Sequence, residues 1–283
     1  MCYTLGKIFL RGGGAMAGLK YPVLLVHGMG FRDGKAINYW GRIPEHLEGL
    51  GCRVFYGGQD SNGTIENNAG FLAERIKQVL EQSGAEKVNV IAHSKGGLDM
   101  RYALSRLGVS GVASLTMVST PHRGSKTMDA LVRLPAFLLR FAGWCSDICL
   151  RIQGDIKPEA YKVFLSFAAQ NAAVFNENTP DRSDVYYQSY AFVMKNPLSD
   201  VFMMVPNLIV RIFDGENDGL LSPESAQWGE FRGVFSGNSR RGISHCDEVD
   251  IRRRALTKRT GGGVSDITEV YTDMIENLRE RGF

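Results

Sequence analysis

Hydrophobic and polar positions divide the chain into short apolar runs and longer amphipathic stretches. The apolar runs are rich in β-branched residues, which is typical of buried strands, and they cover residues 21–28, 53–56, 88–94, 112–120 and 208–213. Apolar residues at spacings of three and four predict helices between the first four runs, over residues 39–50, 69–82 and 97–107. Because strands and helices alternate, we expect an α/β fold with a mostly parallel central sheet and helices on both faces.

Residues 128–150 depart from this alternation. Their apolar residues form one stripe at helical spacing, namely Leu131, Leu134, Phe137, Leu138, Phe141, Trp144, Cys145 and Ile148. The stripe predicts one amphipathic helix or two short ones, with Pro135 at a kink or in a first turn. Residues 266–281 predict a last helix, with Asp266 and Glu269 spaced as a capping box and Gly282 just past its end.

Length and composition fit a globular protein with a large core. The chain has 283 residues, 44% of them hydrophobic, and we expect a single domain over residues 1–283 that carries one insertion. The 33 basic and 30 acidic residues leave a net charge of +3, which does not suggest a nucleic-acid partner. No stretch reaches the roughly 18 apolar residues of a transmembrane segment.

Cysteine usage and the first residues bear on the compartment. The cysteines are odd in number and scattered, which predicts reduced thiols rather than a zinc site or a disulfide framework, at Cys2, Cys52, Cys145, Cys149 and Cys246. The brief apolar stretch at the start is broken by Lys7 and makes a poor secretory signal. We expect a cytoplasmic protein, with secretion left open.

The segment Ala92-His93-Ser94-Lys95-Gly96-Gly97 follows a predicted strand and opens a predicted helix. This is the context of a nucleophile elbow, in which a serine sits on a strained turn between small residues. Ala92 stands where glycine is usual. An unactivated hydroxyl is a poor nucleophile near neutral pH, so Ser94 needs a histidine base and a carboxylate that orients it.

In this fold the chain order is serine, acid, histidine. His245 follows the last predicted strand in a loop that can reach back over the sheet, and we assign it as the base. We expect His27 and His93 to have orienting or hydrogen-bonding roles, His122 to lie near the site, and His46 to have no function. As an accepting base, His245 must be neutral, so activity should rise through a pKa whose reference value is about 6.5.

For the acid, Asp214 and Asp218 both follow the run at 208–213, and spacing alone does not separate them. The oxyanion that develops during acyl transfer needs preorganised N–H donors. We expect them to be the backbone N–H of Lys95, directly after the nucleophile, and that of Met29 in the loop His27-Gly28-Met29-Gly30.

Taken together, six short segments resemble the bacterial true lipases of the α/β-hydrolase fold, the group that includes the Pseudomonas and Burkholderia triacylglycerol lipases. The segments are PVLLVHGMG, VNVIAHSKGGLDMRY, VSTPHRGS, VFNENTPD, GENDGLLS and SHCDEVD, in this order between residues 22 and 250. The resemblance implies a triad of Ser94, Asp218 and His245, with an oxyanion hole from Met29 and Lys95. Its NDGL segment favours Asp218 over Asp214. It also implies hydrolysis of acylglycerol esters at a lipid interface.

The resemblance further implies a helical lid, and residues 126–160 fall where such an insertion would be. An apolar face that covers a cleft in water and turns toward lipid at an interface is buried in both states; the alternative is an ordinary core-packing helix. A structural calcium ion is also implied, with Asp247 matching one ligand and Asp200 the nearest candidate for a second. The cationic run Arg252-Arg253-Arg254 disfavours a nearby cation, so the sequence favours a chain without calcium.

The hypothesis is therefore a serine ester hydrolase of the lipase type that needs no cofactor for its chemistry. Two alternatives remain. The same residues could serve a carboxylesterase of soluble short-chain esters, a phospholipase or an acyltransferase. From a different class, the fold could belong to a protein that binds an acyl ligand without turning it over.

Overall fold

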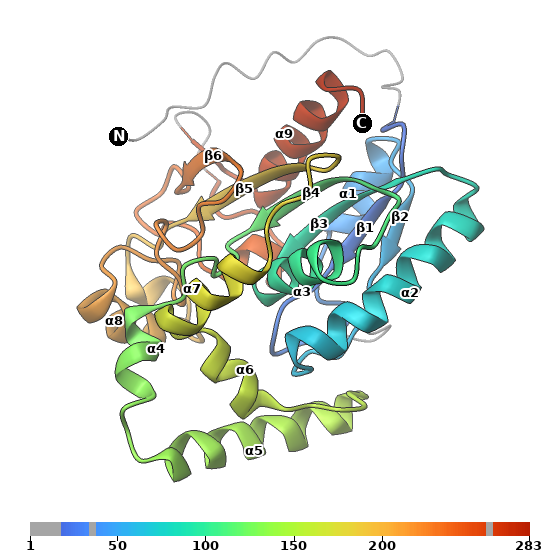
Figure 1. Ribbon diagram of the computed structural model, residues 1–283. Helices are drawn as coiled ribbons and strands as arrows, with labels where there is room; N and C mark the ends of the chain where they lie inside the picture. The colour runs from blue at the N-terminus through green and yellow to red at the C-terminus, as the bar shows by residue number, and fades with distance from the viewer. Residues whose placement is uncertain (1–17, 34–37, 259–262) are drawn as a thin grey trace.

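The computed structural model describes residues 18–33, 38–258 and 263–283, and it contains a six-stranded sheet in the order β2-β1-β3-β4-β5-β6 (Figure 1). All five neighbouring pairs are parallel, as predicted. The strands are β1 (Val23–Val26), β2 (Val54–Tyr56), β3 (Val88–His93), β4 (Val112–Val118), β5 (Tyr186–Phe192) and β6 (Glu230–Phe235). Cys2 and the N-terminal stretch considered as a signal lie outside the described residues.

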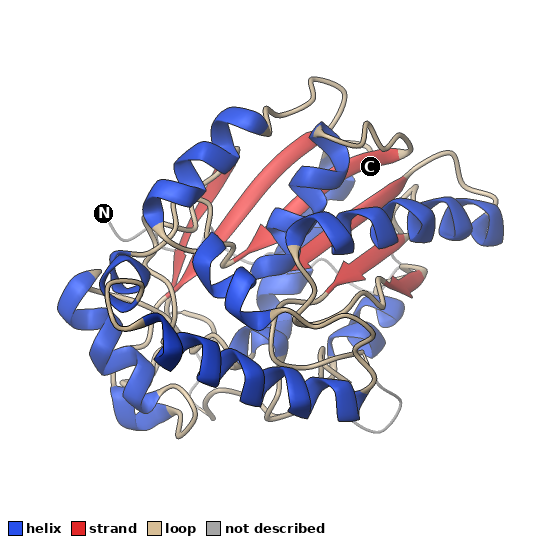
Figure 2. Cartoon of the chain, turned by 60° about the horizontal axis from the view of Figure 1, so that its bottom comes forward, coloured by secondary structure: helices blue, strands red, loops and turns tan. Residues whose placement is uncertain are grey.

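Helices cover both faces of the sheet, which lies between them in Figure 2. The two faces follow from the alternation of side chains along β1. Val23 and Leu25 pack with α1 (Ile43–Gly49) and α9 (Ile267–Glu280). Leu24 and Val26 pack on the opposite side with α2 (Ile65–Ser83) and α3 (Lys95–Ser105).

The segment between β4 and β5 forms α4 (Lys126–Leu131), α5 (Ala136–Gln153), α6 (Ala160–Ser166) and α7 (Ala169–Asn178). Of these, α5 lies farthest from the sheet in Figure 1. Pro135 is the N-cap residue of α5, so the apolar stripe of this region is split between two helices. Between β5 and β6 lie a short 3-10 helix, η1 (Pro197–Ser199), and α8 (Met204–Phe213). Within the described residues, no helix combines the length and hydropathy needed to cross a bilayer.

Two sequence predictions need correction. The strand predicted over residues 208–213 is wrong, because these residues end helix α8. A run of six mostly apolar residues is too short to show a clear period, so a strand and a helix look alike in it. The last helix is confirmed, and the Asp266 carboxylate caps it by accepting from the N–H of Thr268. Glu269, however, accepts from the N–H of Ser265 instead of completing the predicted box at Asp266.

Candidate active site

Ser94 lies on the turn between β3 and α3. Its backbone angles, φ 53° and ψ −129°, belong to a region that non-glycine residues rarely enter. The turn is held from the neighbouring strand, because the N–H of Ser94 donates to the carbonyl of Val118 at 2.8 Å. A Cβ on Gly96 would meet the carbonyl oxygens of Val26 and His27 at 2.6 Å. The strained turn and the small residue after it therefore have the geometry that a nucleophile elbow requires.

Asp218 and His245 are brought into direct contact. His245 Nδ1 lies 2.8 Å from Asp218 Oδ2, and the N–H of His245 donates to the backbone carbonyl of Asp218 at 2.8 Å. The other carboxylate oxygen accepts from the N–H groups of Leu220 and Leu221. Burial alone would raise the pKa of Asp218, but the His245 imidazole and these donors hold it below its usual range. Asp218 is therefore an anion aimed at the imidazole.

Asp214, the other acid considered from the sequence, lies at a different place. Its carboxylate accepts from the hydroxyl of Ser125, the N–H of Lys126, and both the N–H and the hydroxyl of Thr127. These groups form the N-terminus of α4, so Asp214 caps that helix and ties α8 to it. Asp214 has no contact with a histidine among these hydrogen bonds.

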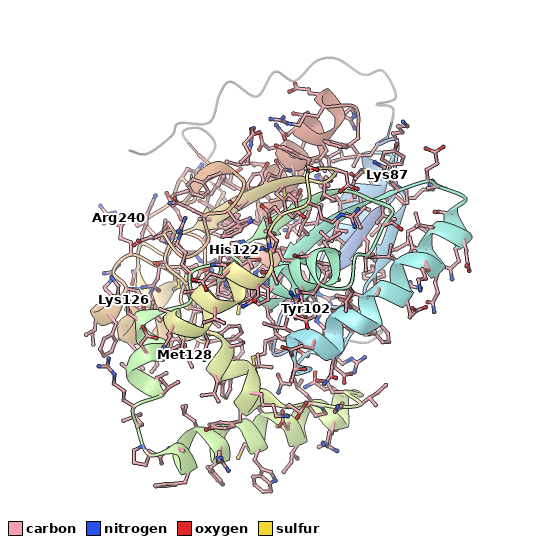
Figure 3. All side chains as sticks on the ribbon, viewed as in Figure 1. Lys87, Tyr102, His122, Lys126, Met128 and Arg240 are labelled. Atoms are coloured by element: carbon pink, nitrogen blue, oxygen red, sulfur yellow. The ribbon has the colours of Figure 1, made fainter. Side chains whose placement is uncertain are left out.

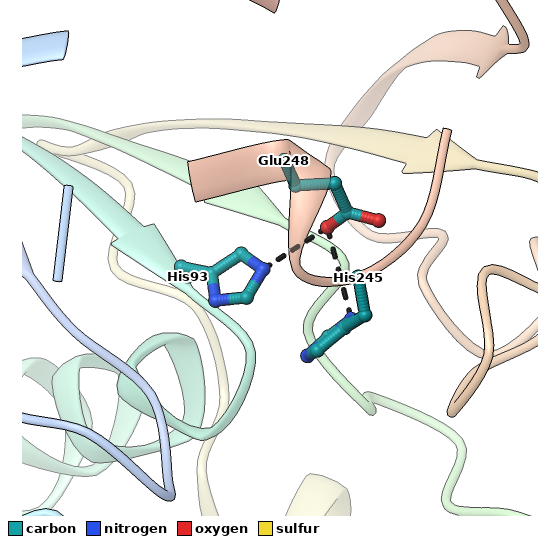
Figure 4. Close-up of side chains that lie close together, drawn as sticks. All are labelled: His93, His245 and Glu248. Atoms are coloured by element: carbon teal, nitrogen blue, oxygen red, sulfur yellow. Dashed lines mark hydrogen bonds and ion pairs between the residues drawn. The ribbon is translucent and has the colours of Figure 1, made fainter. Parts of the chain in front are cut away.

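A second carboxyl group that the sequence interpretation missed lies beside His245 (Figure 4). Glu248 Oε2 is 3.0 Å from His93 Nε2 and 3.8 Å from His245 Nδ1, and the rings of His93 and His245 are 4.4 Å apart. Burial, followed by the negative charge of Asp218, raises the pKa of Glu248 well above its usual value, which favours the protonated form of this carboxyl. The sequence spacing could have suggested this contact, because Glu248 follows His245 by three residues and one helical turn places such side chains side by side.

His93 continues this network toward the loop expected to form the oxyanion hole. Burial and the nearby rings of His245 and His27 hold the pKa of His93 well below 6.5, so its ring is neutral. Its Nδ1 lies 2.6 Å from the hydroxyl of Tyr39, which accepts from the N–H of Gly28 at 3.0 Å. Tyr39 was also missed from the sequence. The predicted hydrogen-bonding role of His93 is present.

The two expected oxyanion donors belong to segments that meet at Ser94. A Cβ built on Gly28 would lie 2.7 Å from the Cβ of Ser94, so this loop packs directly on the elbow, and Met29 is the next residue. Lys95 is the first residue of α3, and its ammonium is buried against the Asp99 carboxylate at 2.7 Å. This ion pair keeps the Lys95 side chain buried inside the protein.

The remaining histidines have structural partners. His27 contacts the carbonyls of Gly28 and Gln59 through its two ring nitrogens. His122, labelled in Figure 3, is buried against Arg101 and the indole of Trp228. His46 contacts the hydroxyl of Thr272.

His93, His245 and Glu248 lie close enough together to hold a metal ion, since their ligand atoms are within 4.8 Å of one another. Their chemistry argues against it, because His245 Nδ1 already contacts Asp218 and burial favours the protonated form of Glu248, which is a poor metal ligand. The arrangement is better described as a buried hydrogen-bond network around an imidazole.

A large apolar surface lies on the helices beyond the sheet. Side chains along α5 project outward in Figure 3, and the helix buries only Gly143 and Leu150. We call the exposed large hydrophobic residues of α5 and α8 the apolar cap; they are Phe137, Leu138, Phe141, Trp144, Ile148, Ile152, Val205, Leu208, Ile209, Ile212 and Phe213. A surface of this size in contact with water indicates an interaction site.

Comparison with known proteins shows the family and the fold of the chain. A family model described as the alpha/beta hydrolase fold matches residues 21–148. The chain is 36% identical over 259 residues to a triacylglycerol lipase of Vibrio cholerae, a match that covers 82% of this chain and 80% of that protein. It is 28% identical over 261 residues to triacylglycerol lipase 2 of Saccharomyces cerevisiae, covering 87% of this chain and 75% of that protein. A mature lipase of Bacillus licheniformis has the same fold, with a TM-score of 0.64 at 19% identity over 96% of both chains.

Proposed function

The chain belongs to the triacylglycerol lipases of the α/β-hydrolase fold, and we propose that it hydrolyses acylglycerol esters through an acyl-enzyme on Ser94. The observation that carries this proposal is the buried Asp218–His245 pair, packed on the residue that precedes a strained serine. This is the arrangement that activates a hydroxyl for attack on an acyl carbon.

In the proposed reaction, Ser94 Oγ forms a bond to the ester carbonyl carbon and His245 takes the hydroxyl proton on Nε2. Nδ1 faces Asp218, which fixes the tautomer and stabilises the imidazolium. The backbone N–H groups of Met29 and Lys95 stabilise the oxyanion. His245 then returns the proton to the departing alcohol, and a water activated in the same way releases the fatty acid and restores Ser94.

The apolar cap supports use of this chemistry at a lipid surface. Its side chains gain about 25 cal/mol for each Å² of apolar area that leaves water, and a lipid surface supplies that burial. We therefore propose that residues 126–160 act as a helical lid that contacts the interface. A soluble short-chain esterase would have no use for this surface.

The nucleophile is tested by Ser94→Ala assayed on a soluble p-nitrophenyl ester. Removing the hydroxyl removes the acyl-enzyme, so turnover should fall at least ~10³-fold. Ser105→Ala on the same helix α3 is the matched control and should retain parental turnover. Near-parental turnover by the Ser94 variant would show that another group attacks the ester.

Two further measurements separate the alternatives. A fluorophosphonate should label the parent chain at Ser94 and leave the Ser94→Ala variant unlabelled, whereas a protein that only binds acyl ligands stays unlabelled throughout. Tributyrin hydrolysis measured below and above its solubility limit should rise sharply once droplets form. A rate that simply saturates with dissolved ester would instead identify a carboxylesterase.

A further inference from the structure

Asp200 and Asp247, the two positions that the lipase resemblance connects with calcium, are brought together from separate parts of the chain. Asp200 follows η1, and Asp247 begins the 3-10 helix η2 (Asp247–Val249) two residues after His245. Ser244 joins them: its hydroxyl donates to Asp200 Oδ2 at 2.5 Å, and its N–H donates to Asp247 Oδ2 at 3.1 Å. Both carboxylates are buried.

Cationic and N–H donors already surround these two carboxylates. Arg252 lies between them, with Nε 3.3 Å from Asp247 Oδ1 and Nη2 3.6 Å from Asp200 Oδ2. Arg241 Nη2 donates to Asp247 Oδ2 at 2.5 Å. The last oxygen, Asp200 Oδ1, accepts from the N–H of Phe202 at 3.0 Å. All four carboxylate oxygens therefore face donors.

This arrangement does not fit a calcium ion. Calcium takes six to eight oxygen ligands at about 2.3–2.6 Å. Here the carboxylate oxygens that would bind the ion already face nitrogen donors. The charge is already balanced, because two guanidinium groups offset two carboxylates. A divalent ion at this point would be repelled by both arginines.

We infer that Arg252, together with Arg241, takes the place of the structural calcium ion and fixes the loop of His245 without a metal. Arg252 is well placed for this role, because its Nη2 also donates to the carbonyl of Ser199 at 2.5 Å and so reaches η1 as well as η2. A guanidinium makes several directed hydrogen bonds at once, which lets one side chain bridge two carboxylates. Because the cation is covalently part of the chain, its occupancy does not depend on the calcium concentration.

Arg252 is thus a positioning residue that acts through Asp247. Asp247 is two residues from His245, and Glu248 in the same short helix contacts the rings of His93 and His245. Loosening Asp247 should disturb the angle of the His245 imidazole without altering residues that bind the substrate. The expected kinetic signature is a lower kcat at an unchanged KM.

The first test is thermal unfolding of the full chain in excess EGTA and in millimolar calcium chloride. The inference predicts the same Tm in both. A Tm that falls in EGTA and returns with calcium would overturn it. This measurement involves no substrate, so its outcome is independent of whether the chain hydrolyses esters.

The second test removes the bridge with Arg252→Ala, beside Arg254→Ala as a matched control from the same cationic run, where the side chain is exposed. The Arg252 variant should lose roughly 5 °C in Tm and roughly tenfold in kcat on a soluble ester with KM unchanged. Arg252→Lys, which keeps the charge, should recover part of both losses. An Arg252→Ala variant that matches the Arg254 control in Tm and kcat would overturn the inference.

The third test asks whether the vacated space accepts the ion. In the double variant Arg241→Ala and Arg252→Ala, two buried carboxylates lose both cationic partners, and millimolar calcium should raise its Tm while leaving the parent unchanged. Magnesium, which is smaller and holds its water more tightly, should do so less well. If the double variant does not fold, the Tm comparison of the parent chain decides the question.

Discussion

The candidate active site and the apolar cap are opposite in chemistry and in burial. Around His245, polar groups are inside: His93 and Asp218 are 1% exposed and Glu248 is fully buried, and each has a hydrogen-bonding partner. On α5, apolar groups are outside, with Phe137 67% and Phe141 64% exposed. Folding thus fixes the polar geometry within this chain, whereas the cap keeps an apolar surface that only another apolar phase can cover.

The two regions also differ in how they are attached. The segment that contains α4 and α5 is tied to the rest of the protein at several points: Asp214 binds the start of α4, Asp147 in α5 accepts from the side-chain amide of Asn62, and Asp155, just past α5, accepts from the N–H groups of Ser61 and Asn62. Between these anchors α5 contributes little to the core. These polar ties at separate points leave most of the α5 surface exposed, so the helix can change position without opening the core of the sheet.

The largest expected effect compares one aspartate from each region. Asp218→Asn keeps the size of the side chain but removes the anion that orients His245, and kcat on a soluble ester should fall about 10³- to 10⁴-fold. Asp214→Asn should leave kcat near the parental value and lower stability by about 1 kcal/mol, because it weakens only the cap of α4.

Kinetics on a soluble p-nitrophenyl ester and thermal unfolding, measured on both variants, check this pair. If Asp214→Asn lost as much kcat as Asp218→Asn, the division between a catalytic acid and a helix cap would be wrong.

The contrast between the two regions explains what the sequence could predict. Ser94, the small residues Ala92 and Gly96 on either side of it, and the α/β alternation depend on local steric rules, which short segments carry. Strand β5 was missed because Gln188 and Ser189 look polar, yet both are buried and bonded, to the hydroxyl of Thr116 and the carbonyl of Trp228. Such partners come from distant segments, and no local pattern announces them.

Contacts between distant segments also explain why the sequence did not predict the polar residues of the network around His245. Glu248 joins the network because η2 meets the end of β3, and Tyr39 joins it because the segment before α1 also reaches His93. The strand predicted at residues 208–213 is a helix whose apolar side faces outward. The apolar side chains of α8 are exposed, like those of α5, and local helix propensity does not determine whether such side chains face the core or the solvent.

The next effect tests the cap. Replacing Phe137, Phe141 and Trp144 together by serine removes the large exposed side chains that an interface would bury. Each is worth about 1.5–3 kcal/mol on full burial, so hydrolysis of a tributyrin emulsion should fall roughly tenfold or more. Turnover of a soluble ester should stay within about twofold, because these three side chains are exposed and contribute little to the core.

Phe71→Ser is the matched control, since Phe71 is an exposed aromatic residue on α2. It should leave both activities unchanged. Equal losses on emulsion and soluble ester in the triple variant would mean that the cap supports the fold of the site and does not bind lipid.

The smallest effect concerns the buried polar network and its dependence on pH. The Glu248 carboxyl titrates near pH 4.5 when unfolded, but burial and the Asp218 anion raise its pKa well above that in the folded chain. The folded state therefore binds the extra proton in this window, and the free energy of unfolding falls as pH rises through it. Glu248→Gln, which is neutral at every pH, should remove up to about 1.4 kcal/mol of this decline for each pH unit.

Denaturant unfolding between pH 5 and pH 8 measures the slope of the free energy of unfolding against pH, with Glu74→Gln on the surface as the reference variant. Parallel slopes for the parent and Glu248→Gln would show that the Glu248 carboxyl is already ionised in the folded chain. The network around His245 would then contain a buried carboxylate instead of a buried carboxylic acid.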